Sequence, residues 1–151
     1  MTSVRIYDLQ ERGLVAELRD LLRLLSPQSL RAHWMISTVK SSIPGHEWFD
    51  ATGGGGEKLE VLAHNNAKIS GANLAALAEK TRQIVWGEFI GSLPLEPSHT
   101  WVIIRVADGT FYEIETNDEA VLHKIGSTYK DVRAGEAPIT SWPLKTVDSW
   151  N

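Results

Sequence analysis

Residues 83–116 constrain the fold of this chain more than any other segment. The runs 83–91, 100–107 and 110–116 are rich in β-branched and aromatic residues and alternate with the period of a strand. The dipeptide Asp108-Gly109 joins the last two runs. It favours a type I′ turn, because both central residues of that turn need a positive φ. The three runs therefore predict an antiparallel meander with residues 100–107 as its middle strand.

A two-residue loop determines which residues of the predicted hairpin oppose each other. It pairs Val106 with Phe111, Arg105 with Tyr112, Ile104 with Glu113, and Ile103 with Ile114. One face then carries Val102, Ile104, Val106, Phe111, Glu113 and Glu115, and the other carries Trp101, Ile103 and Ile114. If helices cover one face alone, the other is an apolar patch bordered by acids. If helices cover both faces, the tryptophans belong to the core.

Helices are predicted both before and after the meander in the chain. Five leucines recur at helical spacing before Ser26-Pro27, which ends that helix: Leu14, Leu18, Leu21, Leu22 and Leu25. Ser70 is a predicted N-cap for a helix that ends near Arg82, because its hydroxyl can accept from the next turn. Thr116 and Glu119 have the spacing of a capping box, so a third helix is expected directly after the last strand.

The remaining segments predict two more strands, at 32–40 and 58–63, and a mobile loop over the sheet at the four glycines 53–56. Beyond Lys130 we expect coil anchored by Trp142 and Trp150. Since domains average roughly 150 residues, the 151 residues predict a single domain, 1–151. The fold class is α+β, with an antiparallel sheet of about four to five strands, the meander 83–116 included, packed by about three helices.

Charge and composition exclude several classes of protein. Apolar residues make up 42% and charged residues 23%, the usage of an ordinary globular domain rather than a disordered chain. The net charge of −4 argues against nucleic acid as a partner, because phosphate binding needs a basic surface. The sequence has no cysteine, signal-peptide pattern or membrane-spanning run, so we expect a cytoplasmic protein with no membrane partner.

The motifs of common enzymes are absent, so we expect no catalytic residue, cofactor or metal site. The histidines at 33, 46, 64, 99 and 123 include no pair at helical metal-site spacing. The glycine run is followed by Glu57, which would repel phosphate. One alternative is a small hydrolase or ligand-binding domain with a pocket between the glycine run and the sheet. In it, Glu113 or Glu115 would act as the base, with His64 or His99 as its partner.

The leading interpretation is a surface that binds another protein. Six tryptophans are many for a chain of this length, and tryptophan is enriched at interface hot spots. Acidic side chains near the hairpin would attract a basic partner and orient it. The predicted partner-binding residues are Trp86, Glu88, Asp108, Glu113, Glu115 and Asp118. A homodimer, or a larger homo-oligomer with a structural role, formed through the same hairpin or sheet face, is a further alternative.

Four segments between residues 70 and 133 carry a resemblance to a known class. They are SGxxLxxLA at 70–78, QIVWGEF at 83–89, TFYEIET at 110–116 and Asp131-Val132-Arg133. In these segments the chain resembles small bacterial immunity-type proteins, which neutralise polymorphic or contact-dependent toxins. The resemblance implies a non-catalytic protein without a cofactor that binds a cognate toxin, and a basic nuclease would suit the acidic charge. It carries over no individual site residue.

Overall fold

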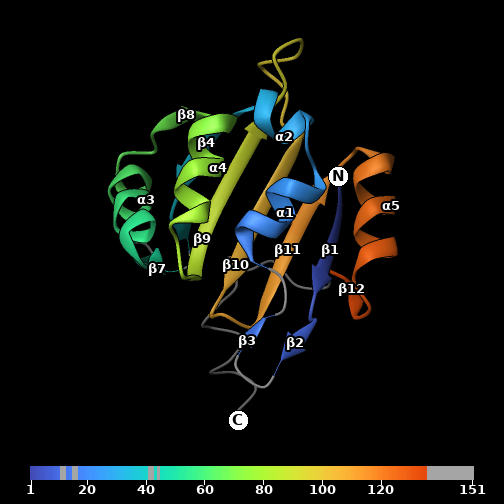
Figure 1. Ribbon diagram of the computed structural model, residues 1–151, viewed down its shortest axis with the longest axis horizontal. Helices are drawn as coiled ribbons and strands as arrows, with labels where there is room; N and C mark the ends of the chain where they lie inside the picture. The colour runs from blue at the N-terminus through green and yellow to red at the C-terminus, as the bar shows by residue number, and fades with distance from the viewer. Residues whose placement is uncertain (11–12, 15–16, 41–42, 44, 136–151) are drawn as a thin grey trace.

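The computed structural model describes residues 1–10, 13–14, 17–40, 43 and 45–135. Within them the fold is α+β, with five helices and a large antiparallel sheet of eight strands (Figure 1). The strand order is β12-β1-β11-β10-β9-β4-β8, and β7 also pairs with β9. The strands are β1 (Thr2–Ile6), β4 (His33–Ser37), β7 (Asp50–Thr52), β8 (Lys68–Ser70), β9 (Gln83–Ser92), β10 (Val102–Ala107), β11 (Phe111–Thr116) and β12 (Val132–Ala134).

The fold class agrees with the sequence prediction, but the predicted four to five strands were too few. The additional strands β1, β7, β8 and β12 are short, with at most five residues, and a period of two is hard to recognise over so few positions. Two small ladders lie outside the large sheet: β2 (Leu9–Gln10) with β3 (Gly13–Leu14), and β5 (Val39–Lys40) with β6 (Glu47–Trp48).

The central meander is confirmed, with β10 hydrogen-bonded between β9 and β11. The predicted turn is also present. Asp108 and Gly109 have φ values of 52° and 62°, and the Thr110 amide donates to the Ala107 carbonyl at 3.0 Å. The predicted register is wrong by one residue, because Ala107 opposes Phe111 and Thr110 is left as an additional loop residue.

This shift exchanges the two faces of β11, because the side-chain period of a strand is two. Arg105 now opposes Glu113, and Ile104 opposes Ile114. Glu113 and Glu115 consequently lie on the face of Ile103 and Arg105, not on that of Ile104 as predicted. Trp101, predicted to share a face with Ile103, is 7% exposed and joins the main core.

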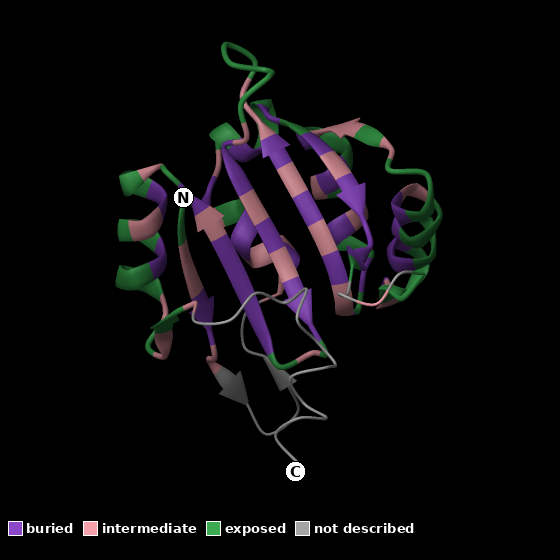
Figure 2. Ribbon diagram, turned by 180° about the vertical axis from the view of Figure 1, so that it is seen from behind, coloured by how far each residue is buried: buried purple, intermediate pink, exposed green. Residues whose placement is uncertain are grey.

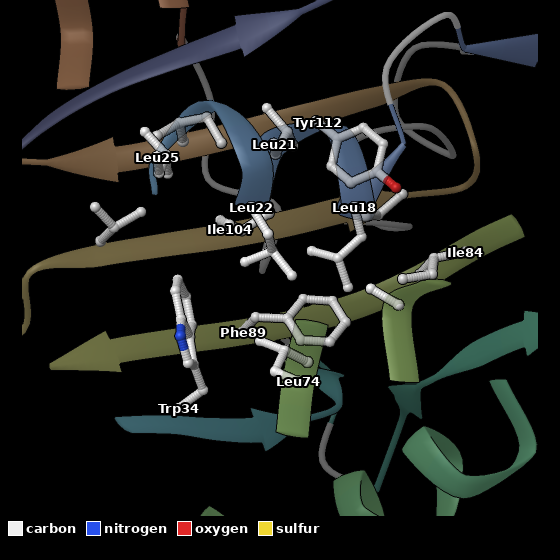
Figure 3. Close-up of a cluster of buried hydrophobic side chains, with 14 of the residues drawn as sticks. Leu18, Leu21, Leu22, Leu25, Trp34, Leu74, Ile84, Phe89, Ile104 and Tyr112 are labelled. Atoms are coloured by element: carbon white, nitrogen blue, oxygen red, sulfur yellow. The ribbon is translucent and has the colours of Figure 1, made fainter. Parts of the chain in front are cut away.

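The helices pack against one face of the sheet (Figure 1). They are α1 (Leu18–Leu24), α2 (Gln28–Arg31), α3 (Gly54–His64), α4 (Gly71–Glu79) and α5 (Glu119–Thr128). Buried side chains from α1, α3, α4 and α5 join those of the strands in one hydrophobic cluster. Figure 3 shows Leu18, Leu21 and Leu22 of α1 over Phe89 and Ile104 of the sheet. We call this side of the sheet the covered face.

Helix capping agrees with the sequence prediction at α4 and differs from it at α5. The Ser70 hydroxyl accepts from the Asn73 amide at 3.1 Å, as predicted. At α5 the N-cap is Asp118, whose carboxylate accepts from the Ala120 amide at 3.0 Å, and not Thr116. The Thr116 hydroxyl donates instead to the Trp101 carbonyl at 2.6 Å. The Thr116 oxygen also accepts from the Asp118 amide at 3.0 Å, so it bonds the backbone one residue before the helix begins.

The segment with the glycine run differs most from its prediction. Residues 54–64 form α3, so there is neither a mobile loop at 53–56 nor a strand at 58–63. Gly55 is buried, and a Cβ there would lie 2.1 Å from the Leu77 carbonyl oxygen of α4. The absence of a side chain lets the two helix ends approach closely. The predicted anchors Trp142 and Trp150 lie outside the described residues.

Figure 2 shows the other side of the sheet, over which none of the described helices lies. Alternation along the strands places one set of side chains here, and we call this side the open face. Its residues include Ser3, Arg5, Met35, Ser37, Trp86, Glu88, Ile90, Ile103, Arg105, Phe111, Glu113 and Glu115.

Candidate functional site

The structure brings four of the six predicted partner-binding residues onto the open face. Trp86 and Glu88 project from β9, and Glu113 and Glu115 project from β11. Asp108 lies in the turn before β11, and Asp118 caps α5 beyond its other end. A strand of six residues spans about 20 Å, so Asp108 and Asp118 lie at opposite ends of the hairpin. The six residues do not form one acidic group.

The centre of the open face holds a network of two arginines and three glutamates. Arg105 donates from Nε to Glu88 at 2.6 Å, and from Nη1 to Glu113 and to Glu115, each at 2.9 Å. Arg5 Nε donates to the second oxygen of Glu113 at 2.9 Å. Burial disfavours the charge of Arg105, but hydrogen bonds and charges from Glu88 and Glu115 outweigh it and raise the pKa of Arg105 above its usual value. Arg105 is therefore the centre of the network.

This network limits what the predicted carboxylate pair, Glu113 and Glu115, can do chemically. Both oxygens of Glu113 accept hydrogen bonds from guanidinium groups, and Glu113 is only 5% exposed. A general base needs a free oxygen within reach of its substrate, and Glu113 has none. Three carboxylates against two guanidiniums leave one negative charge, so the surface is far less acidic than the sequence predicted.

Aromatic side chains gather at the end of the open face near the Asp108-Gly109 turn. The rings of Trp48 and Trp86 stack with centroids 4.8 Å apart, and those of Tyr7 and Phe111 lie 5.3 Å apart. The Arg5 guanidinium lies over the Phe111 ring at 4.5 Å, which links this cluster to the charge network. Trp86 is thus part of a packed group with Val39, Ala107 and Phe111.

A row of apolar side chains lies on the other side of the network. Met35, Ile90 and Ile103 oppose one another across β4, β9 and β10, and each is half-buried. Met35 and Ile90 of this row also line a pocket of about 530 Å³, which opens where β4, β8 and β9 meet. The sequence prediction missed the row because it assigned no register between residues 32–40, 83–91 and 100–107, so their side chains were not aligned with one another.

Arg5 and Arg105 were also missed, although the sequence holds a signal for Arg105. It interrupts the apolar run Val102–Ala107, just as Glu88 interrupts its own strand. A charge in the middle of an apolar strand needs a partner on the same face. Glu88, Arg105 and Glu113 stand at positions that neighbouring antiparallel strands can align.

The residues of the hydrolase alternative are not brought together. His64 is exposed at the end of α3, and His99 lies in an exposed loop, 3.8 Å from Glu96. Neither is bonded to Glu113 or Glu115, whose described partners are arginines. Within the described ranges no three His, Cys, Asp or Glu side chains are grouped so that they could hold a metal ion.

Comparisons with protein-family models, with curated proteins and with solved structures find no match to this chain. The similarity to immunity-type proteins consequently rests on the four sequence segments alone. None of the helices in the described part of the chain is long and apolar enough to cross a membrane.

Proposed function

We propose that this chain is a non-catalytic protein-binding module, and specifically an immunity protein that binds and neutralises a cognate toxin. The observation that carries the proposal is the apolar row Met35, Ile90 and Ile103 beside an ordered guanidinium–carboxylate network, on a sheet face over which no described helix lies. Apolar area bordered by charged groups is a feature of protein interfaces.

The two parts of the open face would make different contributions to binding. Burial of the apolar row supplies affinity, because half-buried side chains lose their remaining contact with water. Glu88 and Glu115 keep 19% and 27% of their side chains exposed, so they can still interact with a partner. Together with the net charge of −4, they favour a basic partner and speed its approach. A toxin that acts on nucleic acid needs a basic surface to bind phosphate, so it would be a partner of this kind.

The test measures association with the protein encoded by the neighbouring gene, which the proposed function predicts to carry the toxin domain. We expect tight binding that weakens with salt, together with loss of toxin activity. Ile103→Ala should weaken binding about tenfold, a loss of roughly 1.4 kcal/mol. Val61→Ala is the matched control, because Val61 is an apolar residue of α3 that is 62% exposed. Equal effects of the two substitutions would contradict the proposed surface.

Charge-reversal variants test the electrostatic contribution of the open face to binding. Glu115→Lys should slow association, and Glu60→Lys on the exposed side of α3 should not. Glu113 is unsuitable for this purpose, because a lysine there would face two guanidinium groups and unfold the sheet. An association rate that is independent of salt and of Glu115→Lys would overturn the electrostatic mechanism. A dimeric mass in dilute solution, with the apolar row buried between copies, would favour the homodimer instead.

A further inference from the structure

The pocket at the edge of the open face is built from two rows of side chains. Lys68, Met35 and Ile90 oppose one another across β8, β4 and β9. Two residues further along, Ser70, His33 and Ser92 oppose one another in the same way. The rows are about 7 Å apart and point to the same side of the sheet. Pro97, from the connection between β9 and β10, also lines the pocket.

None of the polar side chains that line this pocket in the described part of the chain is acidic. They include an ammonium, an imidazole and two hydroxyls. Lys68 is exposed and forms no hydrogen bond or ion pair with the part of the chain that the structure describes. In a chain with a net charge of −4, this pocket therefore offers an uncompensated positive charge beside apolar groups.

We propose that the pocket binds a small amphipathic carboxylate, a molecule with one carboxylate and an apolar tail of several carbons. The tail packs on Met35 and Ile90, and the carboxylate lies against the Lys68 ammonium, with hydrogen bonds available from His33 and Ser92. The volume of about 530 Å³ is within the usual size of small-molecule sites. This ligand site goes beyond the proposed toxin binding and does not depend on it.

Octanoate is a suitable probe, with octylamine and octanol as matched ligands of opposite and zero charge. We expect octanoate to bind at least tenfold more tightly than octylamine, as measured by calorimetry. Affinity should rise from butyrate through hexanoate to octanoate by up to about fourfold for each methylene, the factor for full burial of that group. Amide shifts in the NMR spectrum should centre on β4, β8 and β9.

Charge reversal at the exposed Lys68 separates this site from general adsorption. Lys68→Glu should abolish the preference for octanoate and favour octylamine, whereas the control Lys124→Glu on the exposed side of α5 should leave the preference unchanged. Circular dichroism establishes that both variants remain folded. Equal affinity for octanoate and octylamine, amide shifts centred elsewhere, or equal effects of the two reversals would overturn the proposal.

Discussion

On the covered face, neighbouring strands present Ile6, Trp34, Phe89 and Ile104, each with no measurable exposure. On the open face, the same strands present Arg5, Ser37, Glu88 and Arg105 at neighbouring positions. The covered face is stabilised by burial under the helices, whereas the open face accommodates charges by pairing them. The same strands therefore serve two purposes, because one face stabilises the fold and the other contacts water or a partner.

The largest effect should come from a matched pair of isoleucines in β10. Ile104 is fully buried on the covered face, and Ile103, its neighbour, is half-buried on the open face. Ile104→Ala should lower the free energy of unfolding by about 2–5 kcal/mol. Ile103→Ala should lower it by about 1 kcal/mol. Urea denaturation measures both, and similar losses would show that the two faces are equally buried in solution.

The second effect distinguishes two carboxylates on the same face of β11. Glu113→Gln removes the charge that Arg5 and Arg105 share, and it should destabilise the fold by about 3 kcal/mol, near the lower end for a broken buried pair because Arg105 keeps two other glutamates. Glu115 is more exposed, so Glu115→Gln should cost at most about 1 kcal/mol. If Glu115→Gln destabilised the protein as strongly as Glu113→Gln, the network would not be centred on the buried pair.

A weaker effect should appear at alkaline pH, and it involves the covered face. Burial, followed by the nearby charge of Glu17, raises the pKa of Tyr112 well above its ordinary value near 10. Above that pH the unfolded chain loses the proton and the folded chain keeps it, so the free energy of unfolding falls as the pH rises. Below it, this contribution to stability is fully present. Tyr112→Phe should flatten the fall, and an unchanged slope would contradict the burial of this hydroxyl.

The smallest effect is expected in the turn between β10 and β11, which lies outside both faces of the sheet. Asp108 is exposed in the turn with a positive φ, a conformation that asparagine also adopts readily. Asp108→Asn should change stability by less than about 0.5 kcal/mol. It should alter toxin affinity less than Glu115→Gln does, because the turn lies outside the open face. A larger loss of affinity would extend the binding surface to the hairpin tip.

Local signals in the sequence predicted local structure well. The Asp108-Gly109 turn, the Ser70 cap and the middle position of residues 100–107 are present as expected. The turn and the cap depend on the conformational preferences of a few adjacent residues, which act before any tertiary contact exists. The middle position follows because consecutive strands usually pair. The four glycines are the counterexample, because their composition indicates a loop although three of them form the first turn of α3, where Gly55 lies against Leu77 of α4. That contact joins residues distant in sequence, so no local pattern could reveal it.

The candidate site was predicted only in part for the same reason. Trp86, Glu88, Glu113 and Glu115 were predicted as aromatic and acidic residues of a binding surface, but the face on which Glu113 and Glu115 lie depends on one additional loop residue, Thr110. With the predicted two-residue loop, Glu113 would have shared a face with Ile104, beneath the helices and away from Arg105. The observed register pairs Ile104 with Ile114 and Arg105 with Glu113. An apolar pair therefore lies on the covered face and an oppositely charged pair on the open face.

The positions of most of the longer strands and helices, and the antiparallel pairing of the meander, follow from local sequence patterns. The tertiary structure decided the register of β10 and β11, the face that the helices cover, and the pairing of Arg105 with three glutamates. Turn and cap preferences are properties of neighbouring residues. The free energy of burial and of charge pairing arises only when β1, β4 and α1 come together with the meander, and it outweighs a preference for one loop length.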